Sequence, residues 1–253
     1  RATRLRPVGV RQLGSKAKHG LALRRREREE ARLAREFSKR KFATGNDLLD
    51  AHFATWSQVD HVNRPGFEAA ITLMADRPRI IVETGTSAWG TDSTRLWDAY
   101  VSRFGGEFWS VDLAPAPSLP LQDQVGPRTH LVVDDSVNFL TAFAQEHPDL
   151  AVDVCYLDSW DLDWSDPDPA AAHGLAEWKA VSTLMAPRSV LIIDDSPGSL
   201  DWVPADHDKA ARDYESSHGY LPGKGALAHQ ELVSNPEVRV LWHGYNTVYR
   251  LGP

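Results

Sequence analysis

"VETGTSAWGTDSTRLW", residues 82–97, follows the short apolar run RII and carries the pattern that decides the fold. It predicts a buried strand that ends on Glu83, a loop of small residues with Gly85 and Gly90, and a helix that begins near Thr91. Glycine lets the backbone approach a ligand closely, and the first turn of a helix presents free N–H groups. The stretch therefore indicates either a ligand-binding turn or a plain corner of an α/β fold.

Strand-like runs and helical patterns alternate after this stretch. The strand-like runs are residues 79–83, 107–112, 129–133, 152–157 and 189–194; the helical patterns are 46–74 and about 91–104, 136–147 and 173–186; a Pro-rich loop covers 113–128. Mostly apolar strands that alternate with helices predict a doubly wound, mostly parallel α/β sheet covered on both faces. Runs at 237–242 and 246–251 predict a C-terminal antiparallel hairpin at a sheet edge.

Basic residues are concentrated at the start of the chain. Residues 1–42 contain 15 Lys and Arg against 4 Glu, whereas the remainder contains 13 Lys and Arg against 31 Asp and Glu. We interpret residues 1–42 as a basic arm followed by a helical extension, and residues 43–253 as one domain. The helix is expected to pack on its own domain or to join copies in a homo-oligomer; contact with an anionic surface is the alternative. The acidic body would repel a nucleic-acid backbone, so nucleic acid is not an expected partner.

The remaining composition favours a soluble, cytoplasmic protein. The chain of 253 residues is long enough to bury a sizeable core. Its only cysteine, Cys155, excludes a disulfide within the chain and favours a reducing compartment. No apolar run approaches the roughly 20 residues that a transmembrane helix needs, and the basic first residues lack the apolar segment of a secretory signal. We therefore expect no transmembrane segment and a cytoplasmic location.

Acids at the ends of the second and third strands support the ligand-binding interpretation. Asp112 closes the second strand about 27 residues after Gly85, where a carboxylate can accept both hydroxyls of a ribose. The third strand ends in LVVDDS, so Asp134, Asp135 and Ser136 are placed to bond an adenine amino group. Each acid could instead cap the helix that follows it. The glycine fingerprint of dinucleotide sites and the P-loop motif are both absent, which disfavours NAD enzymes and P-loop NTPases.

The order VETGTSAWG, SVDL and VDDS resembles the class I S-adenosylmethionine-dependent methyltransferases. Over about residues 65–200 the chain is most similar to the metal-dependent O-methyltransferases that modify catechols and sugars, including macrolide and aminocoumarin tailoring enzymes. The resemblance implies a Rossmann-like fold with S-adenosylmethionine as cofactor. It implies that Glu83 and Gly85 line the methionine part, Asp112 the ribose and Asp135-Ser136 the adenine. The expected cofactor-binding residues are Glu83, Gly85, Thr86, Ser87, Gly90, Asp112, Asp135 and Ser136.

Acids also follow the fourth and fifth strands, in YLDSWDLDW and LIIDDSP. If these strands are neighbours, Asp158 and Asp161 lie beside Asp194 and Asp195. Carboxylates that converge without an obvious basic partner repel one another, and a divalent cation with oxygen ligands relieves the repulsion. The resemblance implies that Asp158, Asp194 and Asp195 bind such a cation, with Mg²⁺ expected. An acidic loop without metal, or a set of helix caps, is the alternative.

The expected reaction is a displacement in which a hydroxyl oxygen attacks the activated methyl group. A cation on two adjacent acceptor oxygens lowers the pKa of the hydroxyl, and a base removes its proton. In the family this base lies three residues after the first metal acid, as Lys or His, and here that position is Asp161. Asp158 and Asp161 are therefore the expected catalytic residues. Other candidate bases are His173, His207, His218, His229 and His243.

Residues 196–232 follow the fifth strand, where the family has a variable insertion that shapes the acceptor pocket. Lys224, flanked by glycines in LPGKGAL, either binds an anionic group of the acceptor or is a plain loop lysine. Trp160, Trp164 and Trp202 either stack on a sugar or aryl ring or belong to the core.

We therefore expect an S-adenosylmethionine-dependent, divalent-metal-assisted O-methyltransferase that acts on a hydroxyl of a small-molecule or sugar-containing acceptor. One alternative is a metal-independent methyltransferase of the same fold. Another is a non-catalytic Rossmann-like binding protein whose basic arm binds a polyanion or a protein partner.

Overall fold

The computed structural model describes residues 25, 28–37, 39–87 and 90–252. The chain divides into two compact units, residues 1–41 and residues 42–253. Residues 28–37 of the first unit are helical, and the predicted arm over residues 1–20 lies outside the described residues. None of the described helices is both long enough and apolar enough to cross a membrane.

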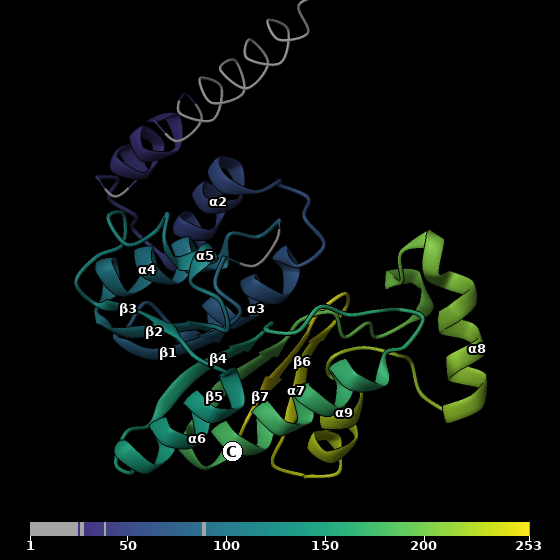
Figure 1. Ribbon diagram of the computed structural model, residues 1–253. Helices are drawn as coiled ribbons and strands as arrows, with labels where there is room; N and C mark the ends of the chain where they lie inside the picture. Colours follow the sequence, from purple (N-terminus) through teal and green to yellow (C-terminus); the bar gives the residue numbers. More distant parts are fainter. Residues whose placement is uncertain (1–24, 26–27, 38, 88–89, 253) are drawn as a thin grey trace, which may run out of the picture. The chain divides into compact units, whose positions relative to one another are not determined.

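A sheet of seven strands forms the centre of the second unit (Figure 1). Its strands are β1 (Arg79–Thr84), β2 (Gly106–Asp112), β3 (Thr129–Val133), β4 (Val152–Leu157), β5 (Met185–Ile193), β6 (Arg239–His243) and β7 (Thr247–Arg250). They are arranged in the order β3-β2-β1-β4-β5-β7-β6. Strands β1 to β5 pair in parallel, β7 pairs antiparallel with β5, and β6 pairs antiparallel with β7 at the edge. This arrangement confirms the predicted parallel sheet and its C-terminal hairpin.

Helices cover both faces of this sheet (Figure 1). One layer contains α2 (Gly45–Trp56), α3 (Arg64–Met74) and α4 (Ser93–Phe104); the other contains α6 (Ser136–Glu146), α7 (Asp168–Val181) and α9 (Ala226–Val233). Short elements complete the unit: α5 (Pro115–Ser118), α8 (Asp208–His218) and the 3₁₀ turns η1 (Ser182–Leu184), η2 (Leu200–Trp202) and η3 (Ala205–His207). The helical extension and the doubly wound sheet are thus both present.

The core follows the alternation of side chains along the central strands. Val82 and Cys155 are completely buried on the face that α6 and α7 cover. On the opposite face, the Phe67 ring of α3 lies 5.5 Å from the ring of Trp97 and 5.2 Å from that of Tyr156. Neighbouring strand residues point to opposite faces, so a strand buried on both sides needs a continuous apolar run. That requirement is the physical reason why the strand-like runs were recognisable.

Prolines account for the helix boundaries that differ from the predicted ones. The helical pattern at 46–74 is interrupted at residues 57–63, and α3 restarts with Pro65 in its first turn. Helix α7 begins with Asp168-Pro169 rather than at residue 173, because the first helical turn tolerates a residue without an N–H group. The predicted Pro-rich loop at 113–128 contains one short helical segment, α5.

The strand order reverses between β1 and β4. From β1 the chain proceeds through β2 to β3 in one direction, and from β4 it proceeds to β5 in the other. In open α/β sheets, ligands bind beyond the carboxyl ends of the strands at such a reversal. Gly85 follows β1 and Asp158 follows β4, so both lie at this point.

The corner after β1 rests on a buried carboxylate. Glu83 is completely buried and accepts hydrogen bonds from the hydroxyls of Ser93, Thr94 and Ser110. Burial raises the pKa of Glu83 to about 7, although the hydroxyl donors oppose the shift. This network connects the end of β1 to the first turn of α4 and to β2.

Gly85 is needed where the corner meets β4. Its φ is +84°, and a Cβ atom here would lie 2.2 Å from the Asp158 carbonyl oxygen; Gly219 has a similar φ of +80° but no atom within 4 Å. Gly219→Ala should therefore cost only the left-handed strain of roughly 1–2 kcal/mol. We expect Gly85→Ala to lower the free energy of unfolding by about 1–3 kcal/mol more, because it also overpacks the backbone. Urea denaturation of the two variants measures this; equal losses would contradict the close approach.

The buried Glu83 should also make stability depend on pH. Since its pKa in the folded protein is about 7 and its ordinary value is 4.5, the folded state binds the extra proton between these values. Stability from this group is complete below about pH 4.5 and is lost as the pH rises through 7. The shift corresponds to roughly 3 kcal/mol. We expect the wild type minus Glu83→Gln difference in unfolding free energy to fall across this window, and a difference that stays constant with pH would contradict the assignment.

Candidate active site

A cavity of about 650 Å³ lies beyond the carboxyl ends of β1 and β4. One part of its wall is the corner after β1 with Gly85, Thr86 and Ser87, together with Asp112 at the end of β2. The acids that follow β4 and β5 form another part: Asp158, Asp161, Asp194 and Asp195. The strands that carry the two sets are neighbours, as the sequence analysis required.

A smaller pocket of about 40 Å³ lies next to the cavity. The two spaces share Gly85, Asp112 and Ser159, and the smaller one is also lined by Asp135 and Ser136. The structure thus brings together six of the eight residues expected to bind the cofactor: Gly85, Thr86, Ser87, Asp112, Asp135 and Ser136. Glu83 and Gly90 are not among the residues that line these two spaces.

Asp112 lies between the cavity and the smaller pocket. Its Oδ2 accepts a hydrogen bond from the Thr86 N–H at 3.1 Å, and its Oδ1 accepts one from the Ala114 N–H at 2.9 Å. These backbone donors fix the orientation of the carboxylate. Each carboxylate oxygen has a second lone pair, so Asp112 retains the capacity to accept two hydroxyl groups.

Asp135, which follows β3, both caps a helix and lines the smaller pocket. Asp135 is the N-cap of α6 and accepts a hydrogen bond from the Asn138 N–H at 2.9 Å, which is the capping alternative that the sequence left open. It also lines the smaller pocket. The hydroxyl of Ser136 lies 3.0 Å from Nε2 of His173 and 3.2 Å from the hydroxyl of Ser159.

Glu83 and Gly90 shape the corner from behind. The carboxylate of Glu83 is satisfied by the three hydroxyls described above. Gly90 has a φ of +81°, and a Cβ atom there would lie 2.9 Å from Nε2 of His61. Ser87, with a φ of +56°, donates its N–H to the Thr94 hydroxyl at 2.7 Å. The glycines of this loop thus serve close approaches within the protein.

The acids after β4 and β5 converge on a lysine. The Lys224 ammonium forms an ion pair with Oδ1 of Asp158 and lies 2.9 Å from Oδ2 of Asp195. Its side chain is only 7% exposed. The expectation that these carboxylates meet without a basic partner is therefore wrong, and Lys224 is not a plain loop lysine. The sequence could not identify Lys224 as the partner of these acids, because 29 residues or more separate the lysine from each of them.

Most oxygens of the three expected metal ligands already have a hydrogen-bond or ion-pair partner. Asp194 accepts from the hydroxyl of Tyr156 at 2.8 Å, from Nδ2 of Asn63 at 3.0 Å and from the N–H of Asp195 at 2.9 Å. The other oxygen of Asp158 lies 3.1 Å from the same Tyr156 hydroxyl, whose single hydrogen serves one acceptor at a time, and that of Asp195 accepts from the Tyr245 hydroxyl at 2.6 Å.

These partners do not fit a cation site. A divalent cation binds several oxygens that are directed at one point, whereas here a lysine ammonium occupies the position between two of the carboxylates. Within the described part of the chain, no group of three or more His, Cys, Asp or Glu side chains is arranged to hold a metal ion. Asp158, Asp194 and Asp195 as placed are thus a lysine-centred cluster.

Burial and charge act in opposite directions within this cluster. Burial raises the pKa of Asp158 and of Asp194, and repulsion from neighbouring carboxylates raises both further. Burial by itself would lower the pKa of Lys224, but the carboxylates of Asp158, Asp195 and Asp194 outweigh it and raise that pKa. The lysine is therefore held in its charged form.

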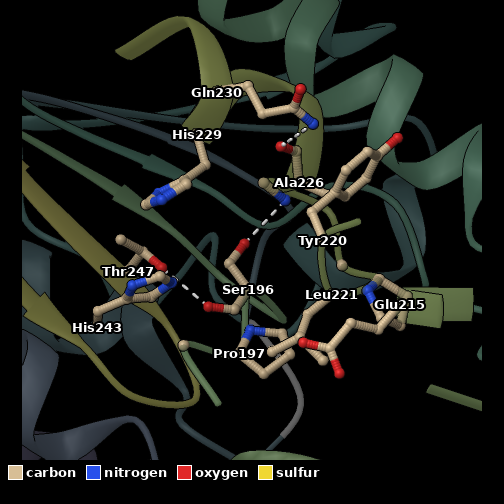
Figure 2. A pocket seen from close by; sticks show the side chains of 14 residues that line it. Ser196, Pro197, Glu215, Tyr220, Leu221, Ala226, His229, Gln230, His243 and Thr247 are labelled. Carbon is tan, nitrogen blue, oxygen red and sulfur yellow. Dashed lines mark hydrogen bonds between the residues drawn. The ribbon is translucent and has the colours of Figure 1, made fainter. Parts of the chain in front are cut away.

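Of the predicted alternative bases, His173 lines the smaller pocket, and the others line neither this pocket nor the main cavity. His173 bonds Ser136 and Ser159, His207 stacks on Trp164 with ring centroids 5.5 Å apart, and His218 stacks on Tyr214 at 3.9 Å. His229 and His243 line a separate pocket of about 230 Å³ (Figure 2).

His61 lines the main cavity and was missed by the sequence analysis. It lies between α2 and α3, away from any strand end, so no motif marked it. Burial lowers the pKa of His61, and the opposing charges of Asp194 and Asp60 do not compensate. The neutral imidazole is therefore favoured at neutral pH. Its Nδ1, which accepts a long hydrogen bond from the Asn63 N–H at 3.3 Å, carries the lone pair that can accept a proton. Tyr156, Asn63 and Tyr245 were also missed, since hydrogen-bonding partners have no sequence signature of their own.

The tryptophans named from the sequence have separate positions. Trp164 is 8% exposed and packs with Val203 and Ala211, which connects the segment after β4 to α8. Trp160 is 47% exposed, lines the smaller pocket and packs on His173 at 4.9 Å. The ring centroids of Trp202 and Trp242 lie 5.7 Å apart. Trp160 and Trp164 thus border the two spaces.

Comparison with known proteins gives structural neighbours only. No family model matches the sequence, and no curated protein matches it. Among solved structures, the chain is similar to the MycE methyltransferase from the mycinamycin biosynthetic pathway in complex with Mg and SAH, with a TM-score of 0.57 and 15% identity. The match covers 84% of this chain and 55% of that one, so this chain spans about half the length of that enzyme. A second structure of MycE, with Mg, SAH and mycinamycin VI, matches with a TM-score of 0.55 and 13% identity.

The chain is also similar to the O-methyltransferase from Bacillus cereus in complex with SAH. The TM-score is 0.50 at 12% identity, and the match covers 85% of this chain and 93% of that one. Both neighbours share the architecture described above, including the sheet at whose edge the cavity lies. The chain has the Rossmann-like fold of the class I S-adenosylmethionine-dependent O-methyltransferases.

Proposed function

We propose that this protein is an S-adenosylmethionine-dependent O-methyltransferase that methylates a hydroxyl of a small-molecule or saccharide-containing acceptor. The proposal rests on the position of Asp112. Two backbone N–H groups hold its carboxylate, and it lines the same cavity as Gly85, near the reversal of strand order. This is where a carboxylate reads a ribose in sheets of this kind. The fold shared with SAH-bound O-methyltransferases supports the same cofactor.

The cavity has room for a donor and an acceptor. S-adenosylmethionine supplies a methyl group activated by its sulfonium. We place the cofactor along the corner after β1, with its adenosine towards Asp112, Asp135 and Ser136. The acceptor then lies towards Lys224, His61 and the acids after β4 and β5, which line the same cavity. The acceptor class is supported by the MycE structure that contains mycinamycin VI.

Removal of the acceptor proton needs a base in the cavity. Asp161, the base expected from the resemblance, lines the cavity and is exposed. His61 lines it as well, is half-buried and favours the neutral form. We propose His61 as the base, because a neutral imidazole accepts a proton without losing a strong ion pair. Asp158 is less suited, since its carboxylate is paired with Lys224.

The contacts of Asp158 and Asp195 favour a metal-independent methyltransferase. Mg in the MycE structures supports the metal-assisted form, which stays a prediction. The lysine between Asp158 and Asp195 supports the metal-independent form. A non-catalytic binding protein remains the alternative from a different class, and a homo-oligomer formed through the N-terminal helix stays a prediction too.

Calorimetry tests the cofactor. We expect the wild type to bind S-adenosylmethionine and SAH, and Asp112→Asn to weaken both at least 10-fold, because a hydrogen bond to a charged group contributes about 1.5–3 kcal/mol. Glu146→Gln is the matched control, since it removes an exposed carboxylate at the far end of α6 and should leave affinity unchanged. Equal affinities of Asp112→Asn and wild type would reject the ribose assignment.

Release of SAH with a panel of sugar and catechol acceptors tests the reaction. We expect His61→Gln to lower kcat/KM by about 100-fold, within the range for loss of a general base. Asp161→Asn should have a smaller effect. Because the pKa of His61 is lowered, wild-type activity should be constant above pH 7 and fall on acidification as the imidazole is protonated. If the activity of His61→Gln still falls on acidification in the same way, a group other than His61 accepts the proton.

A further inference from the structure

The acids that were expected to bind a metal ion are paired with a lysine side chain of the same protein instead. The Lys224 ammonium contacts Asp158 and Asp195, and Asp194 lies close enough to affect its charge. We propose that Lys224 takes the place of the divalent cation: its ammonium neutralises the cluster and donates a hydrogen bond to the acceptor oxygen that is methylated. This inference rests on the proposed function, and it assigns a role to Lys224, whose role the sequence left open.

The backbone around Lys224 is packed to hold it there. Its N–H donates to the carbonyl of Asp195 at 2.9 Å. A Cβ atom at Gly223 would lie 2.5 Å from that same carbonyl oxygen, and one at Gly225 would lie 2.4 Å from the Ser196 hydroxyl. The glycines on both sides of the lysine thus let residues 223–225 lie directly against residues 195–196.

Other elements fix the segment from behind. The Ser196 hydroxyl accepts a hydrogen bond from the Gly225 N–H at 2.8 Å, and the Ser196 carbonyl accepts one from the Thr247 hydroxyl at 2.8 Å (Figure 2). Helix α7 approaches so closely that a Cβ atom at Gly174 would lie 2.3 Å from the Lys224 carbonyl oxygen. The position of the ammonium is therefore determined by strands β5 and β7, by α7 and by the acids.

The ammonium has a donor left for the acceptor. A lysine ammonium has three N–H donors, and two of them are directed to Asp158 and Asp195. Lys224 lines the cavity, together with His61. The third donor is available to an oxygen in the cavity, where a fixed positive charge stabilises the negative charge that develops on that oxygen.

The step balances with groups that are present. The acceptor oxygen forms a bond to the methyl carbon, and the carbon–sulfur bond breaks with its electron pair retained by sulfur. The hydroxyl proton passes to His61. Lys224 is not the proton donor or acceptor of this step, since its ammonium is paired with Asp158 and Asp195. A single ammonium charge is weaker than Mg²⁺, so the acceptor hydroxyl depends more on the base.

Metal titration of the protein with SAH present tests the inference without an acceptor. We expect wild type to bind Mn²⁺, measured by loss of the free-ion electron paramagnetic resonance signal, no better than millimolar. Lys224→Met leaves the carboxylates without a cation, so Mn²⁺ affinity should rise at least 10-fold. Lys209→Met is the matched control, because Lys209 is 90% exposed on α8, and it should behave like wild type.

Two results would overturn the proposal. One is tight Mn²⁺ binding by wild type that Asp195→Asn removes, since the metal would then displace the lysine. The other is an unchanged Mn²⁺ affinity in Lys224→Met. The wild-type measurement does not depend on the folding of any variant. SAH binding on the same samples separates the two ideas: wild type that fails to bind SAH contradicts the proposed function, not the charge assignment.

Turnover provides the second readout once an acceptor is found. Exhaustive chelation should leave wild-type activity unchanged. Lys224→Met should lose about 100-fold in kcat while it retains SAH affinity, as expected when a donor to a developing negative charge is removed. Activity that chelation abolishes and Mg²⁺ restores would return the role to a metal.

Discussion

The reversal of strand order between β1 and β4 is the constraint on which the candidate site depends. Because these strands are neighbours and parallel, the segments that follow them leave the same edge of the sheet. Side-chain and backbone groups that lie 74 residues apart, such as Thr84 and Asp158, thereby come within hydrogen-bonding distance. Gly85 makes the contact possible, since a larger residue would collide with the Asp158 carbonyl. Both segments line the cavity.

The carboxylates on the two sides of this cavity are stabilised by different kinds of partner. On the β1 side, Glu83 is buried beneath hydroxyl donors and Asp112 is held by backbone N–H groups, so neither acid needs a cation. On the β4 and β5 side, carboxylates lie close together in a buried environment, and Lys224 provides the positive charge. A buried charge without a partner is costly, and loss of one member of such a pair typically destabilises a protein by about 3–5 kcal/mol. The lysine and the acids therefore depend on each other.

The similarity to MycE and to the Bacillus cereus enzyme concerns the architecture. At 12% to 15% identity it describes a common sheet and helix arrangement, while the residues that face the cavity belong to this chain. Asp112 and the acids after β4 and β5 lie at the carboxyl ends of strands in that sheet. The lysine comes from the segment after β5, the region expected to vary within the family.

The sequence by itself determined the strands, the parallel sheet, the hairpin and the edge at which Gly85, Asp112, Asp158 and Asp194 gather, because apolar runs and strand-end acids are local patterns. It also implied the cofactor, through motifs in the expected order. Only the tertiary structure decided that Glu83 lies behind the corner, that His61 enters the cavity and that Lys224 reaches the acids. These contacts join segments far apart in the chain. That of Lys224 depends on the close packing of Gly223 and Gly225 against residues 195–196, for which no sequence period exists.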